Sequence, residues 1–274
     1  MSVPVTGHTM VAGIIGDPVT HSRSPAIHNA AYTARGLDWI YVPFPVRRGE
    51  VRAALDGLRA LGAAGCNVTM PHKREAALAC DHLEPVAAAL GVVNTVRVRD
   101  GRLVGDSTDG AGFVDAAREA TVALDRRPVL VLGAGGAARA IVHALRDLAA
   151  IRVWARRADA AEDTATLAPS ADPVPPDELD NVAAASDVIV NATPLGMLGE
   201  PPPFDAQRLH AGQTVIDLVY APADTPLLEA ARAHHAAAIN GLGMLVHQAA
   251  RSFTLLTGCD APLETMWAAA RDDP

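Results

Sequence analysis

Two residues of the sequence, Lys73 and Asp109, could together move a proton to or from a bound molecule. Lys73 ends the stretch GCNVTMPHK (65–73), two residues after a proline that stops an apolar, β-prone run, and Asp109 lies in GDSTDG (105–110). An ammonium group can stabilise a developing oxyanion and donate a proton to it, while a carboxylate orients the ammonium. Each residue also has a plainer interpretation, with Lys73 as a solvated first-turn residue and Asp109 as a helix cap.

Hydroxyl and amide side chains follow other strand-like segments and could hold a polyhydroxylated acid. Ser22 and Ser24 lie in GDPVTHSRSP, where paired hydroxyls can bind a carboxylate. Thr69 and Asn94 lie in TMPHK and GVVNT, and could bind alcohols. The serines could instead cap the helix that follows them. Because ligands of open α/β sheets bind at the carboxyl ends of strands, the recurrence of such residues after successive strands favours a binding site.

The first hundred residues alternate between strand-like and helix-like segments, an order that builds mostly parallel sheets with helices on both faces. A hairpin is indicated by the turn signal Asp100-Gly101. The predicted segments are strands at 11–16, 38–46 and 66–69, helices at 25–36 and 49–62, and the hairpin at 94–106.

The second half begins with a predicted dinucleotide-binding turn. Residues 128–148 form a buried strand, a glycine-rich turn and a helix that starts within the turn. Small residues there let the backbone approach a pyrophosphate, and the helix N-terminus supplies free N–H groups. The other predicted segments are a helix at 110–124, strands at 151–157, 187–193 and 213–219, and proline-rich surface loops at 169–176 and 201–203. The sequence therefore predicts an α/β protein of two domains, a substrate domain with a mostly parallel sheet and a Rossmann-like dinucleotide-binding domain, with a cleft between them.

Composition excludes several classes of protein. The chain has 274 residues, 50% of them hydrophobic, a formal net charge of −8 and three widely spaced cysteines. The charge argues against nucleic-acid binding, and no apolar run approaches the roughly 20 residues that cross a bilayer. Neither a signal peptide nor a disulfide framework is predicted. We expect a cytoplasmic protein with a small-molecule partner, whereas the sequence indicates no oligomeric state.

The histidines and cysteines do not predict a metal site. No histidine belongs to an HExxH pattern or another recognisable ligand spacing with acidic partners. His28 and His247 are expected to face a polar part of an interface between the domains. Cys66, in a β-prone run, is expected to be a small core residue.

Seven motifs occur along the chain: GDPVTHSRSPAIHN (16–29), GCNVTMPHK (65–73), ALGVVNT (89–95), GDSTDGAGF (105–113), GAGGAARA (133–140), DVIVNATPLGM (187–197) and GLGMLVHQAA (241–250). In their order and spacing, these motifs resemble the shikimate dehydrogenase family. The similarity extends from about residue 11 to 260 and implies reversible reduction of 3-dehydroshikimate to shikimate by a nicotinamide cofactor, within the biosynthesis of aromatic compounds. It also implies a substrate-binding domain of residues 1–105 plus 244–274 and a dinucleotide-binding domain of residues 106–243.

The resemblance assigns roles to individual residues. It implies that Lys73 and Asp109 are the catalytic pair. The substrate contacts that it implies are Ser22, Ser24, Thr69, Asn94, Tyr220 and Gln248. The cofactor contacts that it implies are Gly133, Ala134, Gly135, Gly136, Ala137, Thr193, Leu218 and Gly241.

Two alternatives to shikimate dehydrogenase stay open. Dehydrogenases of quinate or of amino-substituted analogues share most of these motifs, although quinate-using members often carry threonine where this chain has Ser24. A non-catalytic NADP(H)-binding regulatory module is an alternative of another class, against which the intact Lys73 and Asp109 count.

The residues after the strand that follows the glycine-rich turn predict NADP, with NAD as an open alternative. Turns that bind NAD usually place an acid at the end of this strand, to hold the ribose 2′-hydroxyl. Here Ala155, Arg156 and Arg157 occupy that place, and two guanidinium groups can pair with a 2′-phosphate. The alternative is a solvated basic pair at a helix start, where it would oppose the helix dipole.

The chain departs from the pattern of the family at several positions, and Ala155 and Arg157 stand where asparagine and threonine or serine are common. Ser107 stands where asparagine is usual, Ala160 where a second arginine is common, and Pro194 where serine usually follows the threonine at 193. The last three of these departures bear on the loop before Asp109, the 2′-phosphate site and the nicotinamide pocket, respectively.

Overall fold

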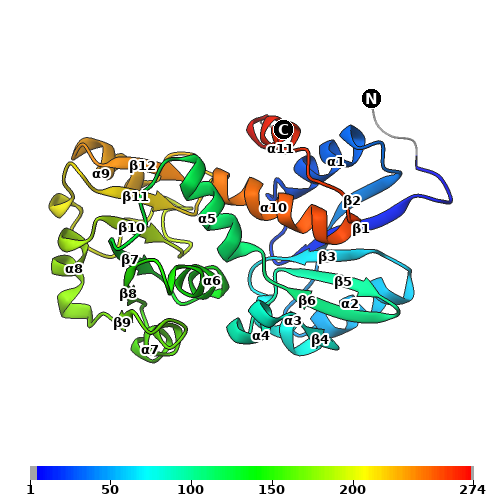
Figure 1. The fold of residues 1–274 in the computed structure, drawn as a ribbon, viewed down its shortest axis with the longest axis horizontal. Helices are drawn as coiled ribbons and strands as arrows, with labels where there is room; N and C mark the ends of the chain where they lie inside the picture. The colour runs from blue at the N-terminus through cyan, green and yellow to red at the C-terminus, as the bar shows by residue number, and fades with distance from the viewer. Residues whose placement is uncertain (1–4, 273–274) are drawn as a thin grey trace. The chain divides into compact units, whose positions relative to one another are not determined.

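The computed structural model describes residues 5–272, which form two compact units, each built on one six-stranded sheet (Figure 1). Among the described residues, the first unit is 5–112 with 245–272, and the second is Phe113–Met244. The predicted fold of two α/β domains is confirmed. Helices α5 (Asp109–Glu119) and α10 (Leu242–Thr257) each contain a boundary between the units.

The sheet of the first unit is mixed, with strand order β2-β1-β3-β5-β6-β4. Strand β1 is parallel to β2 and β3, β5 is antiparallel to β3 and β6, and β4 is parallel to β6. The β5–β6 hairpin turns at Asp100 and Gly101, both with positive φ, as the turn signal predicts. The strands are β1 (Met10–Gly16), β2 (Trp39–Pro45), β3 (Gly65–Val68), β4 (His82–Leu83), β5 (Thr95–Arg99) and β6 (Arg102–Asp106).

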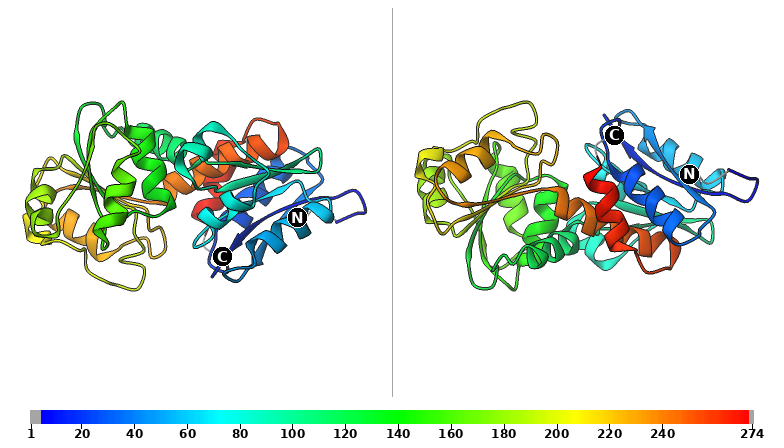
Figure 2. Two further views of the ribbon diagram at one scale, coloured as in Figure 1. Left: turned by 90° about the horizontal axis from the view of Figure 1, so that it is seen from below. Right: turned by 90° about the horizontal axis from the view of Figure 1, so that it is seen from above.

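Helices from both ends of the chain cover this sheet. The first helix, α1, and the last, α11, lie side by side (Figure 2). Arg23 Nη1 donates to the Ala270 carbonyl at 2.6 Å, and Arg35 Nε donates to the Asp260 carbonyl at 2.8 Å. The helices of this unit, besides parts of α5 and α10, are α1 (Ser24–Ala34), α2 (Val51–Ala60), α3 (Lys73–Ala79), α4 (Pro85–Leu90) and α11 (Leu263–Arg271).

The sheet of the second unit is entirely parallel, with strand order β12-β11-β10-β7-β8-β9. The interpretation of residues 169–176 as a surface loop is wrong in part, because Ala171–Pro173 forms β9 at the edge of the sheet. An edge position tolerates the proline, which has no N–H to donate. The other strands are β7 (Pro128–Leu132), β8 (Ala150–Trp154), β10 (Val188–Asn191), β11 (Thr214–Asp217) and β12 (Ala237–Asn240).

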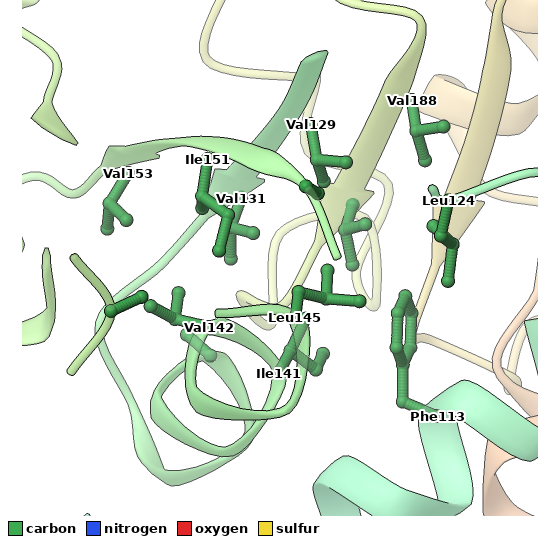
Figure 3. Close-up of a cluster of buried hydrophobic side chains, with 14 of the residues drawn as sticks. Phe113, Leu124, Val129, Val131, Ile141, Val142, Leu145, Ile151, Val153 and Val188 are labelled. Atoms are coloured by element: carbon green, nitrogen blue, oxygen red, sulfur yellow. The ribbon is translucent and has the colours of Figure 1, made fainter. Parts of the chain in front are cut away.

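The apolar run of β7 packs on both faces of this sheet. Val129 and Val131 join one buried cluster with Ile141 and Leu145 of α6 (Figure 3), while Leu130 and Leu132 join the cluster on the opposite face. Alternation with a period of two residues, on a strand covered from both sides, accounts for a continuous hydrophobic sequence. The helices of this unit are α6 (Gly136–Leu145), α7 (Ala158–Ala165), α8 (Leu179–Ala185) and α9 (Pro226–Ala233), with 3-10 turns η1 (Pro176–Glu178) and η2 (Ala206–Arg208).

His28 lies in the aromatic core of the first unit, so its predicted place at an interface between domains is wrong. Its ring stacks on Tyr41 with 4.3 Å between centroids and 3° between planes, and it also lies near Tyr32 and Phe253. The side chain is almost completely buried, and burial lowers the pKa of His28 from 6.5 to about 3. Cys66, in contrast, is the buried core residue that the sequence predicts, and burial raises its pKa.

Replacing His28 should reduce the sensitivity of the first unit to acid. The folded state holds this imidazole neutral down to about pH 3, whereas the unfolded chain protonates it near its ordinary pKa of 6.5. The free energy of unfolding therefore falls with falling pH across that window, by about 1.4 kcal/mol per pH unit from this one proton. His28→Phe keeps an aromatic ring on Tyr41 and should remove that slope, measured by urea unfolding from pH 4 to 7.

The matched control is His8→Phe, which changes an exposed histidine of the same unit. It should leave the pH dependence of unfolding as it is in the unaltered chain. An unchanged slope in His28→Phe would contradict the assignment of this proton to His28.

Candidate functional site

Lys73 and Asp109 form an ion pair in the first unit. Lys73 Nζ lies 2.5 Å from Asp109 Oδ2, and the side chains are 17% and 5% exposed. Lys73 is the first residue of α3 and Asp109 is the first residue of α5. Neither side chain is therefore simply solvated, and the structure brings together the two groups that the sequence selects for proton transfer.

Asn94 and Gln248 complete a cluster around this pair. Asn94 Nδ2 donates to Asp109 Oδ1 at 2.8 Å and lies 3.2 Å from Gln248 Oε1. The Asn94 carbonyl oxygen, Oδ1, accepts the backbone N–H of Thr108 at 2.9 Å. Both oxygens of the Asp109 carboxylate thus have a donor, which fixes the plane of the group.

A row of buried polar residues lies behind Asn94, and the sequence analysis did not select it. Thr95 Oγ1 donates to Asn94 Oδ1 at 3.0 Å and lies 3.1 Å from Asn67 Nδ2. Asn67 also donates to Ser252 Oγ at 2.7 Å and accepts from Tyr41 OH at 2.7 Å. A polar residue at the centre of the buried strand GCNV is the signal that could have found this row.

The three other hydroxyls predicted in the first unit lie elsewhere, with Ser22 and Thr69 in loops and Ser24 at the first position of α1. The N-cap of α1 is Arg23, with no side-chain cap bond, and Ser22 Oγ accepts the N–H of Ser24 at 3.2 Å. Thr69 directly follows β3, and its N–H donates to the Ile15 carbonyl at 3.0 Å. No hydrogen bond described in residues 5–272 joins these hydroxyls to the Lys73 cluster, so their role as substrate contacts stays a prediction.

The glycine-rich turn of the second unit lies between β7 and α6. Gly133 has φ of +117°, and a Cβ there would stand 3.0 Å from the Ala192 carbonyl oxygen and 3.2 Å from Thr193 Cγ2. Gly135 is the N-cap of α6, and a Cβ there would meet no atom within 4 Å. The turn, which includes Ala134, Gly136 and Ala137, therefore leaves open space beside a helix N-terminus, an arrangement that fits a dinucleotide pyrophosphate.

The loop after β11 packs directly on the start of α10. A Cβ at Gly241 would stand 2.0 Å from the Leu218 carbonyl oxygen, so no other residue fits there without a shift of the backbone. Tyr220 follows in the same loop and is half-buried. Leu218, Tyr220 and Gly241 all belong to the second unit.

A buried carboxylate, Asp217, joins the loops after β10 and β11, and the sequence analysis did not select it. Asp217 Oδ1 accepts from Asn191 Nδ2 at 2.9 Å and from the Val219 N–H at 3.0 Å, and Oδ2 accepts from Thr225 Oγ1 at 2.6 Å. Burial raises the pKa of Asp217, against the effect of these three donors. Asn191 Oδ1 in turn accepts the N–H of Thr193 at 3.1 Å and its hydroxyl at 2.6 Å.

Arg156 and Arg157 lie between β8 and α7, and both are exposed. Arg157 is the N-cap of α7, and its Nε lies 3.4 Å from Asp159 Oδ1. Both residues follow β8, the second strand of the second unit along the chain, where the sequence predicts contact with a 2′-phosphate.

Within residues 5–272, no three His, Cys, Asp or Glu side chains gather as a metal site would require. Nor does that part of the chain contain a helix with the length and hydrophobicity needed to cross a membrane.

Similarity to known proteins extends over almost the whole chain. The family model "Shikimate dehydrogenase substrate binding domain" matches residues 14–96, and "Shikimate 5'-dehydrogenase C-terminal domain" matches residues 241–271. Over 272 residues, 40% are identical to a shikimate dehydrogenase (NADP(+)) of Methanothermobacter thermautotrophicus, with 96% of each chain covered. The chain belongs to the shikimate dehydrogenase family. A shikimate dehydrogenase (NADP(+)) of Rubrobacter xylanophilus is 43% identical over 276 residues, with 97% of each chain covered.

Solved structures of this family have the same fold. A shikimate 5-dehydrogenase of Thermus thermophilus in complex with NADP(H) and shikimate is 34% identical, with a TM-score of 0.87 and 96% and 98% of the two chains covered. A shikimate 5-dehydrogenase of Listeria monocytogenes in complex with shikimate and NAD is 35% identical, with a TM-score of 0.86 and coverage of 97% of this chain and 98% of that one. A quinate dehydrogenase of Corynebacterium glutamicum in complex with NAD is 31% identical, with a TM-score of 0.87 and coverage of 95% of this chain and 98% of that one. Both nicotinamide cofactors are thus represented among the relatives.

Proposed function

We propose that this member of the shikimate dehydrogenase family catalyses the reversible, NADP-dependent reduction of 3-dehydroshikimate to shikimate. The observation that carries the proposal is the Lys73–Asp109 ion pair, held by Asn94 at 2.8 Å within the unit that matches the substrate-binding domain. Two relatives that match almost the whole chain at 40% and 43% identity are shikimate dehydrogenases (NADP(+)), which supports both the reaction and the cofactor. The substrate is a small molecule, and the proposal places the reaction in the cytoplasm.

In this proposal the first unit binds the substrate and the second binds the dinucleotide. Ser22 and Ser24 hold the carboxylate, while Thr69, Asn94 and Gln248, with Tyr220 of the second unit, contact the rest of the substrate. The turn from Gly133 to Ala137, together with Arg156, Arg157, Thr193, Leu218 and Gly241, receives NADP. The open space at Gly135 and the exposed guanidinium groups fit that cofactor.

The chemistry assigned to this chain is a proton transfer at the C3 oxygen. When bound, the nicotinamide supplies the hydride in reduction and accepts it in oxidation. Lys73 donates a proton to the oxygen as negative charge grows there, and its ammonium stabilises that charge. Asp109 orients Lys73, and the Asn94 amide holds the second oxygen of the carboxylate, so the pair acts as one coupled group.

Substrate preference tests the proposal directly. Purified protein should have a higher kcat/KM for shikimate than for quinate or amino-substituted analogues, followed by absorbance of the reduced nicotinamide. Ser24→Thr should shift the ratio toward quinate, because an added methyl group changes the room around the carboxylate. Cofactor binding with no turnover of any of these substrates would favour the non-catalytic module. A preference for quinate or an amino-substituted analogue would contradict the shikimate assignment.

Removal of the Lys73 ammonium should abolish most of the turnover. Lys73→Ala is expected to lower kcat by about 100-fold or more, with KM for shikimate within a few-fold, as loss of a general acid predicts. The control is Arg74→Ala, which removes the neighbouring exposed cation and should retain nearly full kcat. Retention of most of the turnover in Lys73→Ala would show that another group moves the proton.

Arg156 should determine the choice between NADP and NAD. NADP is expected to be the better cofactor, and Arg156→Ala should raise KM for NADP by about tenfold while leaving KM for NAD nearly unchanged, because a charge-assisted bond to the 2′-phosphate is lost. The control is Arg152→Ala, an exposed arginine of β8 that pairs with Asp172 and should change neither constant. Equal or better use of NAD by the unaltered chain would contradict the assignment.

A further inference from the structure

We propose that Asp217 and Asn191 are positioning residues, which hold the loops after β10 and β11 in the form that binds the nicotinamide half of the cofactor. This inference rests on the proposed function, because it takes Thr193 and Leu218 as neighbours of that half. It adds two residues, both buried, that do not themselves need to touch the cofactor.

The first support is the direction of the hydrogen bonds. Asp217 Oδ1 accepts the Val219 N–H, so this oxygen can only accept and must face the amide nitrogen of Asn191. The Asn191 amide nitrogen also donates to the Leu195 carbonyl at 3.0 Å. The Asn191 oxygen is thereby turned toward Thr193. Asp217 thus sets the orientation of an amide that has no freedom to flip.

The second support is the effect on Thr193. Its hydroxyl proton goes to Asn191 Oδ1 at 2.6 Å, and its oxygen accepts the Leu195 N–H at 3.2 Å. A hydroxyl has one proton and two acceptor lone pairs, so the oxygen keeps one lone pair for a ligand donor. The Asn191 amide therefore determines which role the Thr193 hydroxyl can have.

The third support is the place of these loops in the sheet. Chain order reverses between β7 and β10, and ligands of open α/β sheets bind at the carboxyl ends of strands at such a point. The loop after β10 is packed against Gly133, since a Cβ on that glycine would stand 3.2 Å from Thr193 Cγ2. The loop after β11 is packed against Gly241 through Leu218. Asp217 is fully buried and connects the two loops, because it accepts hydrogen bonds from Asn191 at the end of β10 and from Val219 after β11.

A purely structural role is the competing explanation. Asp217 Oδ2 accepts from Thr225, the N-cap of α9, so the carboxylate also stabilises the start of that helix. Loss of this function would lower stability and affect every ligand of the second unit alike. A positioning role, in contrast, should affect the nicotinamide half of the cofactor and spare the adenosine half.

The test compares two substitutions of Asp217 with two probes. Asp217→Leu removes both acceptors, whereas Asp217→Asn keeps an oxygen that can accept from Val219 and Asn191. The probes are NADPH and adenosine 2′,5′-bisphosphate, which lacks the nicotinamide, both measured by titration calorimetry. Asp217→Leu should weaken NADPH binding and lower kcat by about tenfold each, the effect of one or two lost hydrogen bonds. In the same variant, the affinity for the bisphosphate and KM for shikimate should stay within twofold of the unaltered chain. In Asp217→Asn, both affinities, kcat and KM should all stay within about threefold of the unaltered chain.

If Asp217→Leu does not fold, Asn191→Ala decides the question, because it cuts the link to Thr193 and leaves the bonds of Asp217 to Val219 and Thr225. Asn191→Ala should likewise weaken the binding of NADPH and leave the affinity for the bisphosphate nearly unchanged. Equal losses for NADPH and the bisphosphate, or unchanged NADPH affinity and kcat, would overturn the inference. Failure of the proposed function would show differently, as an unaltered chain that does not turn over shikimate.

Discussion

The candidate active site depends on one partly buried contact, between the ammonium of Lys73 and the carboxylate of Asp109. Removing two charges from water costs free energy unless their remaining hydrogen bonds are satisfied. Asp109 meets this requirement with Lys73 on one oxygen and Asn94 on the other. Asn94 is held in turn by Thr108 and Thr95, so the geometry of a proton donor is set by a polar row that runs into the core of the unit.

The second unit also contains a buried carboxylate whose oxygens accept hydrogen bonds, but its partners differ from those of Asp109. Asp217 is a buried carboxylate with three donors, but no cation lies among the partners described for it. Its donors are an amide, a hydroxyl and a backbone N–H, so the group orders two loops and has no charged partner to orient. The comparison shows how one residue type takes two tasks: Asp109 fixes an ammonium, whereas Asp217 fixes the direction of an amide.

The sequence predicts those features that depend on local chemistry. The Asp100-Gly101 turn, the strand and glycine-rich turn of 128–137, and the start of a helix at Lys73 all follow from residue types close together in the chain. Long-range packing determines the rest. Strand β9 is only three residues long and forms because β8 has an unpaired edge for it to pair with. The residues near His28 in the sequence do not predict that the ring of Tyr41 stacks on it.

The same limit applies to the site. Lys73 and Asp109 could be selected because their chemistry is evident from their side chains and their motifs. Asn67 and Asp217 could not, since their importance lies in which oxygens and nitrogens face them after folding.

The bond from Arg23 to the Ala270 carbonyl has a consequence for the order in which the protein acquires its structure. The second unit is continuous in sequence and can fold on the ribosome as soon as Met244 has emerged. The first unit cannot, because α1 packs on α11, which follows the whole second unit in the chain. The segment with the two serines of the proposed substrate site therefore cannot pack on its partner helix until the second unit and α11 have both been synthesised. Until then the side of α1 that packs on α11 is uncovered, and the second unit can finish folding before the first does.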